Sequence, residues 1–310
     1  MNKLKLGRLL LTILSVFPKK YSIESKKDIP EPFFILNSGR CGSTLFNRLL
    51  NQHSQIFLPE EQYFLHLLII KFRLYNWILW RDLGKILAGE LMTSLGTHWW
   101  DFDCRETYKD IVCATGDERS LKSVIDKIFK AYAQQTGKSP QIWGDSTPPL
   151  IGRYAKEVYR AYPDAKYLLL VRDPRDVIAS FKKGADTLPF MHLENVVKAA
   201  ENWKNVYDMA KWVNRRTSAF KIVRYEELVS DPKRIVEETI SFLGLENQDL
   251  NFTRATFPDN RFYNMPYHKN LKNPINQDSI GKWKTELSDK ELNDVMPIIE
   301  KPMLDLGYVR

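Results

Sequence analysis

Short apolar runs alternate with longer segments of helical spacing along most of the chain. Four short runs predict buried strands: residues 33–36, 141–145, 166–171 and 219–223. Apolar positions at helical spacing predict helices over residues 44–51, 119–135, 151–162, 174–183, 192–215 and 231–243. Because strands and helices alternate, we expect an α/β domain with a mostly parallel central sheet and helices on both faces.

The segment from residue 62 to residue 80 is rich in aromatic and aliphatic side chains. Lys71 and Arg73 interrupt it, which argues against a membrane span. One interpretation is a helix that packs over the core. The other is a wall for an apolar acceptor, or a surface that faces a membrane. We favour the core helix.

The first 32 residues form an N-terminal segment and linker that precede a domain of residues 33–310. Residues 9–17 are apolar and are flanked by basic residues: Lys3, Lys5, Arg8, Lys19 and Lys20. A spanning helix needs about 20 apolar residues, so this run is too short to cross a bilayer. It predicts either a basic helix on a membrane surface or a helix packed on the domain. Residues 22–32 are polar and end in Pro-Glu-Pro, which is typical of a linker.

The net charge of +8 over 310 residues indicates either an anionic partner or a merely basic surface. The basic residues are spread along the chain without a known nucleic-acid-binding motif, so we expect no nucleic-acid partner. The three cysteines are odd in number and form no Cys-x-x-Cys pair, which favours a reducing compartment. We expect a cytoplasmic protein, with peripheral membrane contact through the N-terminal segment as an open alternative.

The first candidate site follows the strand predicted at residues 33–36. Its residues are Ser38, Gly39, Arg40, Cys41, Gly42, Ser43 and Thr44. Two glycines allow backbone N–H groups to approach an anion at the N-terminus of the next helix. The loop resembles a P-loop, but no lysine stands before Ser43 and the cation is Arg40. A phosphate-binding loop without Mg²⁺ is the functional interpretation, and a structural tight turn is the alternative.

The second candidate site follows the strand predicted at residues 166–171. Arg172 stands at the carboxyl end of this strand, where open α/β sheets bind ligands. A guanidinium there can hold phosphate oxygens in two places, and Ser180 on the next helix is near enough to join it. For Arg175 we favour an Arg–Asp surface network.

Together these two sites resemble the PAPS-dependent sulfotransferases, where PAPS is 3′-phosphoadenosine-5′-phosphosulfate. The resemblance implies a P-loop nucleotide-binding fold, with residues 38–45 at the phosphosulfate and with Arg172 and Ser180 at the 3′-phosphate. It also implies nucleotide contacts from Tyr225, which begins a Tyr-Glu-Glu-Leu stretch, and from Ser279 and Lys282 near the C-terminus.

Within the family the chain looks most similar to the protein-tyrosine and related Golgi-type branch. That resemblance implies Glu61 as the base that deprotonates the acceptor and Arg40 as the cation that stabilises the transferring sulfonate. Glu60 stays open as the base, and His53 is more typical of a helix end. Alternatively, both glutamates cap the helix that begins near Gln62.

The chain departs from the family at Ser146, where many relatives carry a lysine that helps to stabilise the sulfonate. We also expect no long membrane anchor of the kind typical of Golgi members, which argues against a Golgi location.

We expect transfer of a sulfonate from PAPS to a hydroxyl or amine acceptor, with release of PAP (3′-phosphoadenosine-5′-phosphate) and without a metal. The acceptor is unknown: a glycan, lipid, peptide or small molecule. The alternatives are a P-loop kinase or other nucleotide-binding protein, and a non-catalytic, membrane-associated binding protein.

Overall fold

A five-stranded sheet with the order β2-β3-β1-β4-β5 lies at the centre of the molecule, and every strand pair is parallel. The structure is a computed structural model that describes residues 18–94, 99–147, 150–184, 195–252 and 273–309. The strands are β1 (Phe33–Leu36), β2 (Ile56–Phe57), β3 (Ile142–Asp145), β4 (Lys166–Val171) and β5 (Phe220–Arg224). β1 is buried throughout, as is usual for a strand covered on both faces of a parallel sheet.

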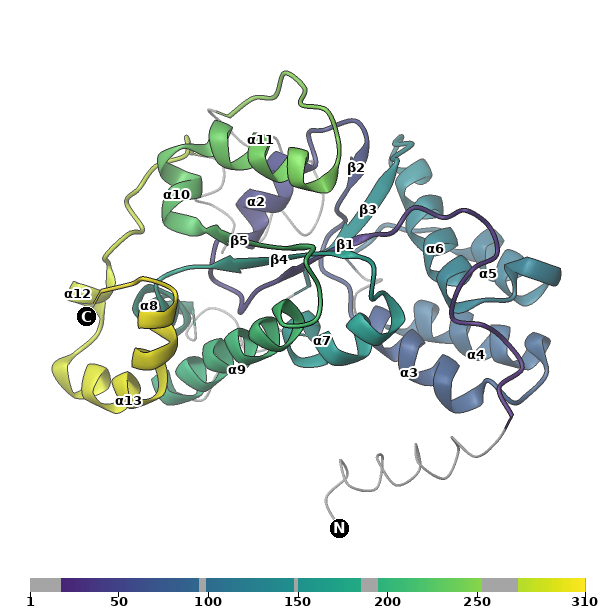
Figure 1. Ribbon diagram of the computed structural model, residues 1–310, viewed down its shortest axis with the longest axis horizontal. Coiled ribbons are helices and arrows are strands. Elements are labelled where there is room, and N and C mark those ends of the chain that lie inside the picture. The colour runs from purple at the N-terminus through teal and green to yellow at the C-terminus, as the bar shows by residue number, and fades with distance from the viewer. Residues whose placement is uncertain (1–17, 95–98, 148–149, 185–194, 253–272, 310) are drawn as a thin grey trace, which may run out of the picture.

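Helices cover both faces of the sheet (Figure 1). One face carries α2 (Ser43–Leu50), α10 (Tyr225–Ser230) and α11 (Pro232–Leu243), and the other carries α7 (Leu150–Ala161) and α9 (Val196–Asn214). Beyond the β2–β3 side lie α3 (Leu65–Tyr75), α4 (Trp80–Thr93), α5 (Arg105–Val112) and α6 (Leu121–Gln135). At the opposite side lie α8 (Pro174–Gly184), α12 (Trp283–Glu286) and α13 (Asp289–Asp305). The expected α/β architecture is therefore confirmed.

Local signals in the sequence account for several element boundaries. The Asp231 side chain accepts a hydrogen bond from the backbone N–H of Arg234, and Pro232 occupies the first turn of α11. Gly244 ends α11 in the left-handed region at a φ of 80°. Strand β4 has the predicted bounds because its apolar run is buried from Tyr167 onward.

The aromatic segment 62–80 is not one helix. α3 ends at Tyr75 and α4 begins at Trp80, because the buried Asn76 side chain turns away to bond with the backbone of Tyr21. The buried residues of α3 include Leu68 and Phe72, which agrees with the interpretation of core packing.

Residues 22–31 lie along the domain instead of forming a free linker. The carbonyls of Ser22 and Ile23 accept hydrogen bonds from the backbone of Leu121 and Lys122. The buried Lys122 ammonium pairs with Glu24 at 2.7 Å. The predicted N-terminal helix at residues 9–17 lies outside the described residues. Among the described residues, no helix combines the length and apolar character needed to cross a membrane.

Candidate active site

The sheet has a switch point between β1 and β4. These strands are neighbours, but the chain leaves β1 toward β2 at one edge and leaves β4 toward β5 at the other. Ligands of open α/β sheets bind in the crevice at the carboxyl ends of such a strand pair. The loop 37–42 follows β1, and Arg172 follows β4, so both lie at this crevice.

The loop after β1 depends on left-handed backbone conformations. Gly39, Arg40 and Gly42 have φ values of 78°, 57° and 88°. Gly42 is the N-cap of α2 without a side-chain cap, so the first N–H groups of α2 face the crevice. A Cβ atom at Gly42 would lie 2.4 Å from Cδ2 of Tyr225. Glycine is therefore required there for both the backbone conformation and the close ring.

Buried amides anchor this loop to distant elements. Asn37 Nδ2 donates to the carbonyl of Ser146 at 2.9 Å, and Asn37 Oδ1 accepts from the N–H of Gly39 at 3.0 Å. On α9, Asn202 Nδ2 donates to the carbonyl of Ser38 at 3.0 Å. The sequence analysis did not single out either asparagine.

Arg40 and Ser180 meet across the crevice. Nε of Arg40 donates to Oγ of Ser180 on α8 at 3.0 Å. Two residues assigned to different parts of the nucleotide, 140 positions apart, thus lie in direct contact.

Arg172 connects the other predicted nucleotide-binding residues. Its guanidinium lies over the Tyr225 ring, 4.7 Å from the centroid, and Nη1 donates to the carbonyl of Arg40 at 3.2 Å. Nη2 donates to the carbonyl of Ser279, so Ser279 takes part through its backbone. The residue is only 7% exposed, yet the buried Nε has no acceptor within the described residues. The Nε–H group of Arg172 is thus available to donate a hydrogen bond to an anion.

The C-terminal turn docks on Asp176 of α8. Its buried carboxylate accepts from the N–H of Gly281 at 2.8 Å and from the N–H of Trp283 at 2.9 Å. This contact fixes Ser279 against Arg172, and the intervening Lys282 is exposed. Asp176 is a positioning residue that the sequence analysis missed.

The two glutamates have different surroundings. Glu60 is buried: its carboxylate accepts from the Tyr132 hydroxyl at 3.1 Å, and its carbonyl accepts from Trp100 Nε1 at 2.9 Å. Glu61 is half-buried and accepts from the Tyr63 hydroxyl at 3.2 Å. At the start of α3, Gln62 Oε1 accepts the N–H groups of Phe64 and Leu65 at 2.8 Å. The interpretation that the two glutamates cap this helix stays a prediction.

The pKa of Glu61 is raised from 4.5 to about 7, chiefly by burial and to a lesser extent by the nearby charge of Asp145. The Tyr63 hydrogen bond and the charge of Arg40 act in the opposite direction. Burial also raises the pKa of Asp145, to about 6. A carboxyl group that titrates near neutral pH beside an arginine suits a general base.

A buried polar network holds the Glu61 segment against the end of β3. Gln62 Nε2 donates to Asp145 Oδ2 at 2.5 Å, and the Thr147 hydroxyl donates to Asp145 Oδ1 at 2.7 Å. The N–H of Gln62 donates in turn to the Thr147 hydroxyl at 3.0 Å. These bonds set where the neighbouring Glu61 lies.

Ser146 is buried, and its hydroxyl accepts from Asn47 Nδ2 at 2.9 Å. A neutral pair therefore occupies the position where the family resemblance would place a lysine. Arg40 is the cation that influences Glu61 most directly.

Two other predicted residues serve the structure. Arg175 forms an ion pair with Asp173 at 2.7 Å and lies over the Trp283 ring, so the expected Arg–Asp network exists but is buried instead of exposed. His53 lies beyond the end of α2, where its Nε2 contacts the carbonyl of Glu246 at 2.9 Å.

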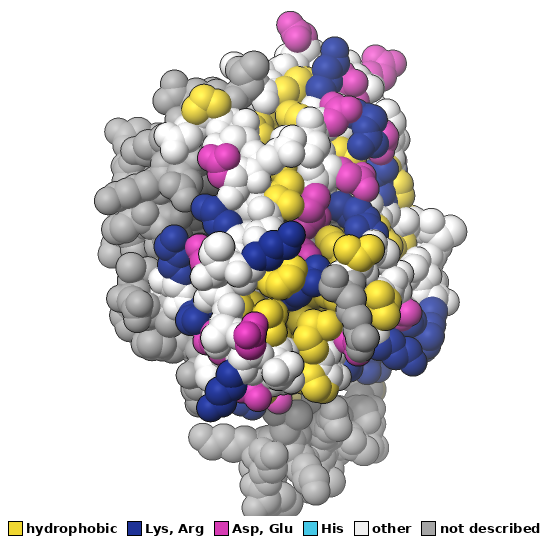
Figure 2. Space-filling model, turned by 90° about the vertical axis from the view of Figure 1, so that its left-hand side faces the viewer, with side chains coloured by type: hydrophobic (Ala, Val, Ile, Leu, Met, Phe, Trp, Pro, Cys, Tyr) yellow, Lys and Arg dark blue, Asp and Glu magenta, His cyan; other side chains and the backbone are white. Residues whose placement is uncertain are grey.

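The carboxyl end of β4 leads to the side of the molecule that Figure 2 shows. Near the middle of that face, Lys and Arg side chains lie beside hydrophobic ones. Among the described residues, no three His, Cys, Asp or Glu side chains gather as a metal site.

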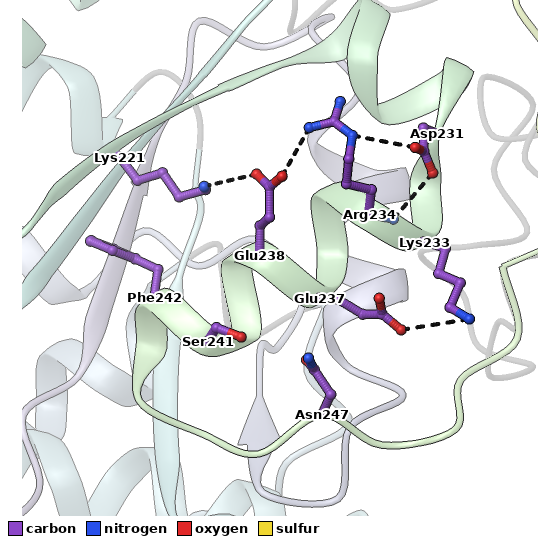
Figure 3. A pocket seen from close by; sticks show the side chains of 9 residues that line it. All are labelled: Lys221, Asp231, Lys233, Arg234, Glu237, Glu238, Ser241, Phe242 and Asn247. Carbon is purple, nitrogen blue, oxygen red and sulfur yellow. Dashed lines mark hydrogen bonds and ion pairs between the residues drawn. The ribbon is translucent and has the colours of Figure 1, made fainter.

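Figure 3 shows a separate pocket on α11, lined by Lys221, Asp231, Lys233, Arg234, Glu237, Glu238, Ser241, Phe242 and Asn247. Glu238 pairs there with Arg234 at 2.9 Å and with Lys221 at 3.2 Å. Lys221 lies near the start of β5, whereas the crevice lies at the strand ends. The cations of the α11 pocket form ion pairs with acidic residues of the same pocket, so we do not assign the active site there.

Comparisons with known proteins indicate the same family that the sequence resembles. The model of the "Sulfotransferase family" matches residues 32–249. Nodulation protein NoeE of Sinorhizobium fredii is 24% identical over 90% of this chain and 66% of its own length. The protein-tyrosine sulfotransferase of Drosophila melanogaster is 24% identical over 89% of this chain and 51% of its own length. The chain thus spans about half to two thirds of the length of these relatives.

Among solved structures, the sulfotransferase domain of the Synechococcus PCC 7002 olefin synthase is similar in fold. Its TM-score is 0.63 at 20% identity, and the match covers 94% of this chain and 100% of that one.

Proposed function

Because the chain belongs to the sulfotransferase family, we propose that it transfers a sulfonate group from PAPS to an acceptor and releases PAP. One observation supports this proposal most: Arg40, Arg172 and Glu61 lie around the same crevice, at the switch point of the sheet. The first two supply positive charge for an anionic nucleotide, and the third supplies a base.

The residues around the crevice fit PAPS. The N–H groups of the loop 38–44 suit the phosphosulfate, because several left-handed residues aim backbone donors at one point. Arg172 and Ser180 suit the 3′-phosphate: the buried Arg172 Nε has no acceptor in the described structure, and a phosphate oxygen would satisfy it. We propose Tyr225 as a platform beside this phosphate, since Arg172 already lies over its ring.

In the proposed reaction, Glu61 takes the proton of the acceptor hydroxyl as that oxygen attacks sulfur. The new bond joins the acceptor oxygen to sulfur, and the bond between sulfur and the bridging phosphate oxygen breaks. The electron pair remains on that phosphate oxygen, where Arg40 stabilises the developing negative charge. As in phosphoryl transfer, positioning and charge stabilisation supply most of the catalysis, so we propose no catalytic metal.

The acceptor is an alcohol or amine on a glycan, lipid, peptide or small molecule. A mass-spectrometric search in a host that expresses the protein tests the proposal. Molecules heavier by one sulfonate group should appear with the wild-type chain and should be absent with Glu61→Gln. If the two hosts contain the same sulfated molecules, the proposal is wrong.

A further inference from the structure

Exposed hydrophobic side chains gather where α3 meets α4. Tyr75, Trp77 and Leu79 are 36%, 37% and 66% exposed, within five consecutive positions. Large apolar residues scattered singly are ordinary on protein surfaces, but three at one corner mark an interaction site. We call residues 18–21 together with residues 75–85 the corner surface.

The two parts of the corner surface are locked together. Asn76 Oδ1 accepts from the N–H of Tyr21 at 2.7 Å, and Asn76 Nδ2 donates to the carbonyl of Tyr21 at 2.8 Å. The N–H of Lys20 donates to the carbonyl of Asn76 at 3.0 Å, and the Tyr21 ring meets the Trp80 ring edge-on. Figure 1 shows the start of the described chain beside α3 and α4. The exposed side chains of both parts therefore share one rim.

The charge of the corner surface is unbalanced. Lys19, Lys20, Arg81 and Lys85 are exposed, and the described part of the chain gives none of them an ion pair. Asp82 is the single acidic residue in these two stretches. Some exposed lysines elsewhere have an ion pair, as Lys26 has with Asp117 at 3.0 Å. Four unpaired cations beside three apolar side chains suit a partner that is both anionic and apolar.

The sequence that precedes the corner surface is also both basic and apolar. Residues 9–17 are apolar, and Lys3, Lys5 and Arg8 precede them. This run is too short to cross a bilayer, but its composition suits the boundary between headgroups and acyl chains. It reaches the described structure at Pro18, two residues before Lys20, whose N–H donates to the carbonyl of Asn76.

We propose that the corner surface docks on an anionic lipid bilayer. Trp77, Tyr75 and Leu79 enter the interfacial region, where Trp and Tyr rings are enriched in membrane proteins. The four cations lie over the acidic headgroups. A second copy of the chain is a poorer occupant, because a two-fold contact would set the same four cations against one another.

This orientation keeps the catalytic residues close to the membrane. Glu61 precedes the N-terminus of α3, and the corner surface lies at its C-terminus. The 11 residues of α3 span roughly 16 Å at 1.5 Å per residue. A bilayer at the corner surface would place the crevice within about one helix length of the lipid headgroups.

Cosedimentation with phosphatidylcholine vesicles, with and without phosphatidylglycerol, tests the proposal on the full chain. Wild type should bind the anionic vesicles and bind neutral ones weakly. Trp77→Ser/Leu79→Ser should bind anionic vesicles about tenfold more weakly, because two apolar side chains no longer enter the interface. Arg81→Gln/Lys85→Gln should lose the preference for anionic vesicles.

Matched controls separate the corner surface from general surface properties. Ile222→Ser/Leu304→Ser removes side chains of comparable exposure, 46% and 52%, on β5 and α13. Lys198→Gln/Lys204→Gln removes two cations from α9 whose side chains are 50% and 41% exposed. Both control variants should bind like wild type, and unchanged melting temperatures confirm that every variant is folded.

Several outcomes would overturn the proposal. Failure of anionic vesicles to retain wild type is one of them. Another is equal retention of Trp77→Ser/Leu79→Ser and wild type, which would assign binding to residues 1–17 alone. Sedimentation equilibrium tests the other occupant considered above, a second copy of the chain. If wild type forms a dimer and Trp77→Ser/Leu79→Ser does not, the corner surface is a contact between copies.

Discussion

Glu61 and Glu60 are adjacent in sequence but differ in what their carboxylates contact. The Glu60 carboxylate bonds to Tyr132 in the core, whereas the Glu61 carboxylate is half-buried and lies near the charge of Arg40. These adjacent residues of an irregular segment direct their carboxylates to different partners, Tyr132 and Tyr63. The structure thus supports Glu61 as the residue that reaches an acceptor.

Glu61→Gln should lower turnover by about 10²–10⁴-fold, the usual contribution of a positioned general base. PAP affinity should be unchanged, because the amide is nearly isosteric and Glu61 is not assigned to the nucleotide. The matched variant Glu60→Gln should keep near-normal turnover. Steady-state kinetics and calorimetric PAP titration measure both, and full activity in folded Glu61→Gln would remove Glu61 from the mechanism.

The pH dependence follows from the environment of Glu61. As a base it must be ionised, so kcat/KM should rise with pH through about 7, where burial places its pKa. A profile that is already flat above about pH 5.5, near the ordinary range of carboxyl groups, would contradict this assignment.

The same raised pKa affects stability. Between pH 4.5 and about 7 the folded chain binds more protons at Glu61 than the unfolded chain does, so stability falls as pH rises through that range. Glu61→Gln has no such proton to lose. Its melting temperature relative to wild type should therefore increase by about 5 °C between acidic and mildly alkaline pH. A difference that does not change with pH would show that Glu61 titrates normally.

Arg172→Ala should weaken PAP binding by about 1.5–3 kcal/mol, because a charge-assisted contact to the 3′-phosphate is lost. Adenosine 5′-phosphosulfate lacks that phosphate and serves as the internal control, so its affinity should change much less. Calorimetric titration of both nucleotides measures the difference. Equal losses would mean that Arg172 supports the fold of the crevice and does not recognise the 3′-phosphate.

At the scale of elements, the loop from β1 to α2 is the most constrained turn at the site. Its Gly42 has a φ of 88° and faces the Tyr225 ring. Gly42→Ala should lower the free energy of unfolding by about 1–3 kcal/mol and weaken PAP binding, because both the backbone and the ring must shift. In the matched variant Gly89→Ala, the added Cβ within α4 meets nothing within 4 Å. That variant should be slightly stabilised, and denaturant unfolding distinguishes the two.

Elements that local signals specify could be predicted from the sequence. The apolar run of β4 and the Asp231, Pro232 and Gly244 signals of α11 are examples. β2 could not, because its two residues form a strand only through pairing with β3. The break between α3 and α4 was missed for a similar reason: Asn76 ends α3 by bonding to Tyr21, which lies 55 positions away.

The residues of the site also divide into those with a local signal in the sequence and those that depend on contacts with distant elements. Loop glycines and an arginine at a strand end are recognisable in the sequence, so Gly42 and Arg172 were found. Asn37, Asn202 and Asp176 act by holding backbone groups from other elements. Asp176 and Gly281, for example, are 105 positions apart. Nothing local to these residues indicates that role.

At the scale of the whole molecule, the sheet order and the charge of the chain converge on one crevice. The switch point brings the loop after β1 and Arg172 after β4 together, and the net charge of +8 favours anionic ligands. A P-loop kinase would need a lysine before Ser43, and the chain has Gly42 there. The architecture therefore favours PAP over ATP with Mg²⁺.

Thermal unfolding with PAP in a metal-chelating buffer, compared with ATP plus Mg²⁺, tests the central claim most directly. At about 100 times its Kd, PAP should stabilise the folded chain by about 2.7 kcal/mol, and this gain should be largely lost in Arg172→Ala. ATP with Mg²⁺ should shift the melting temperature little. Stabilisation by ATP with Mg²⁺ and none by PAP would contradict the account.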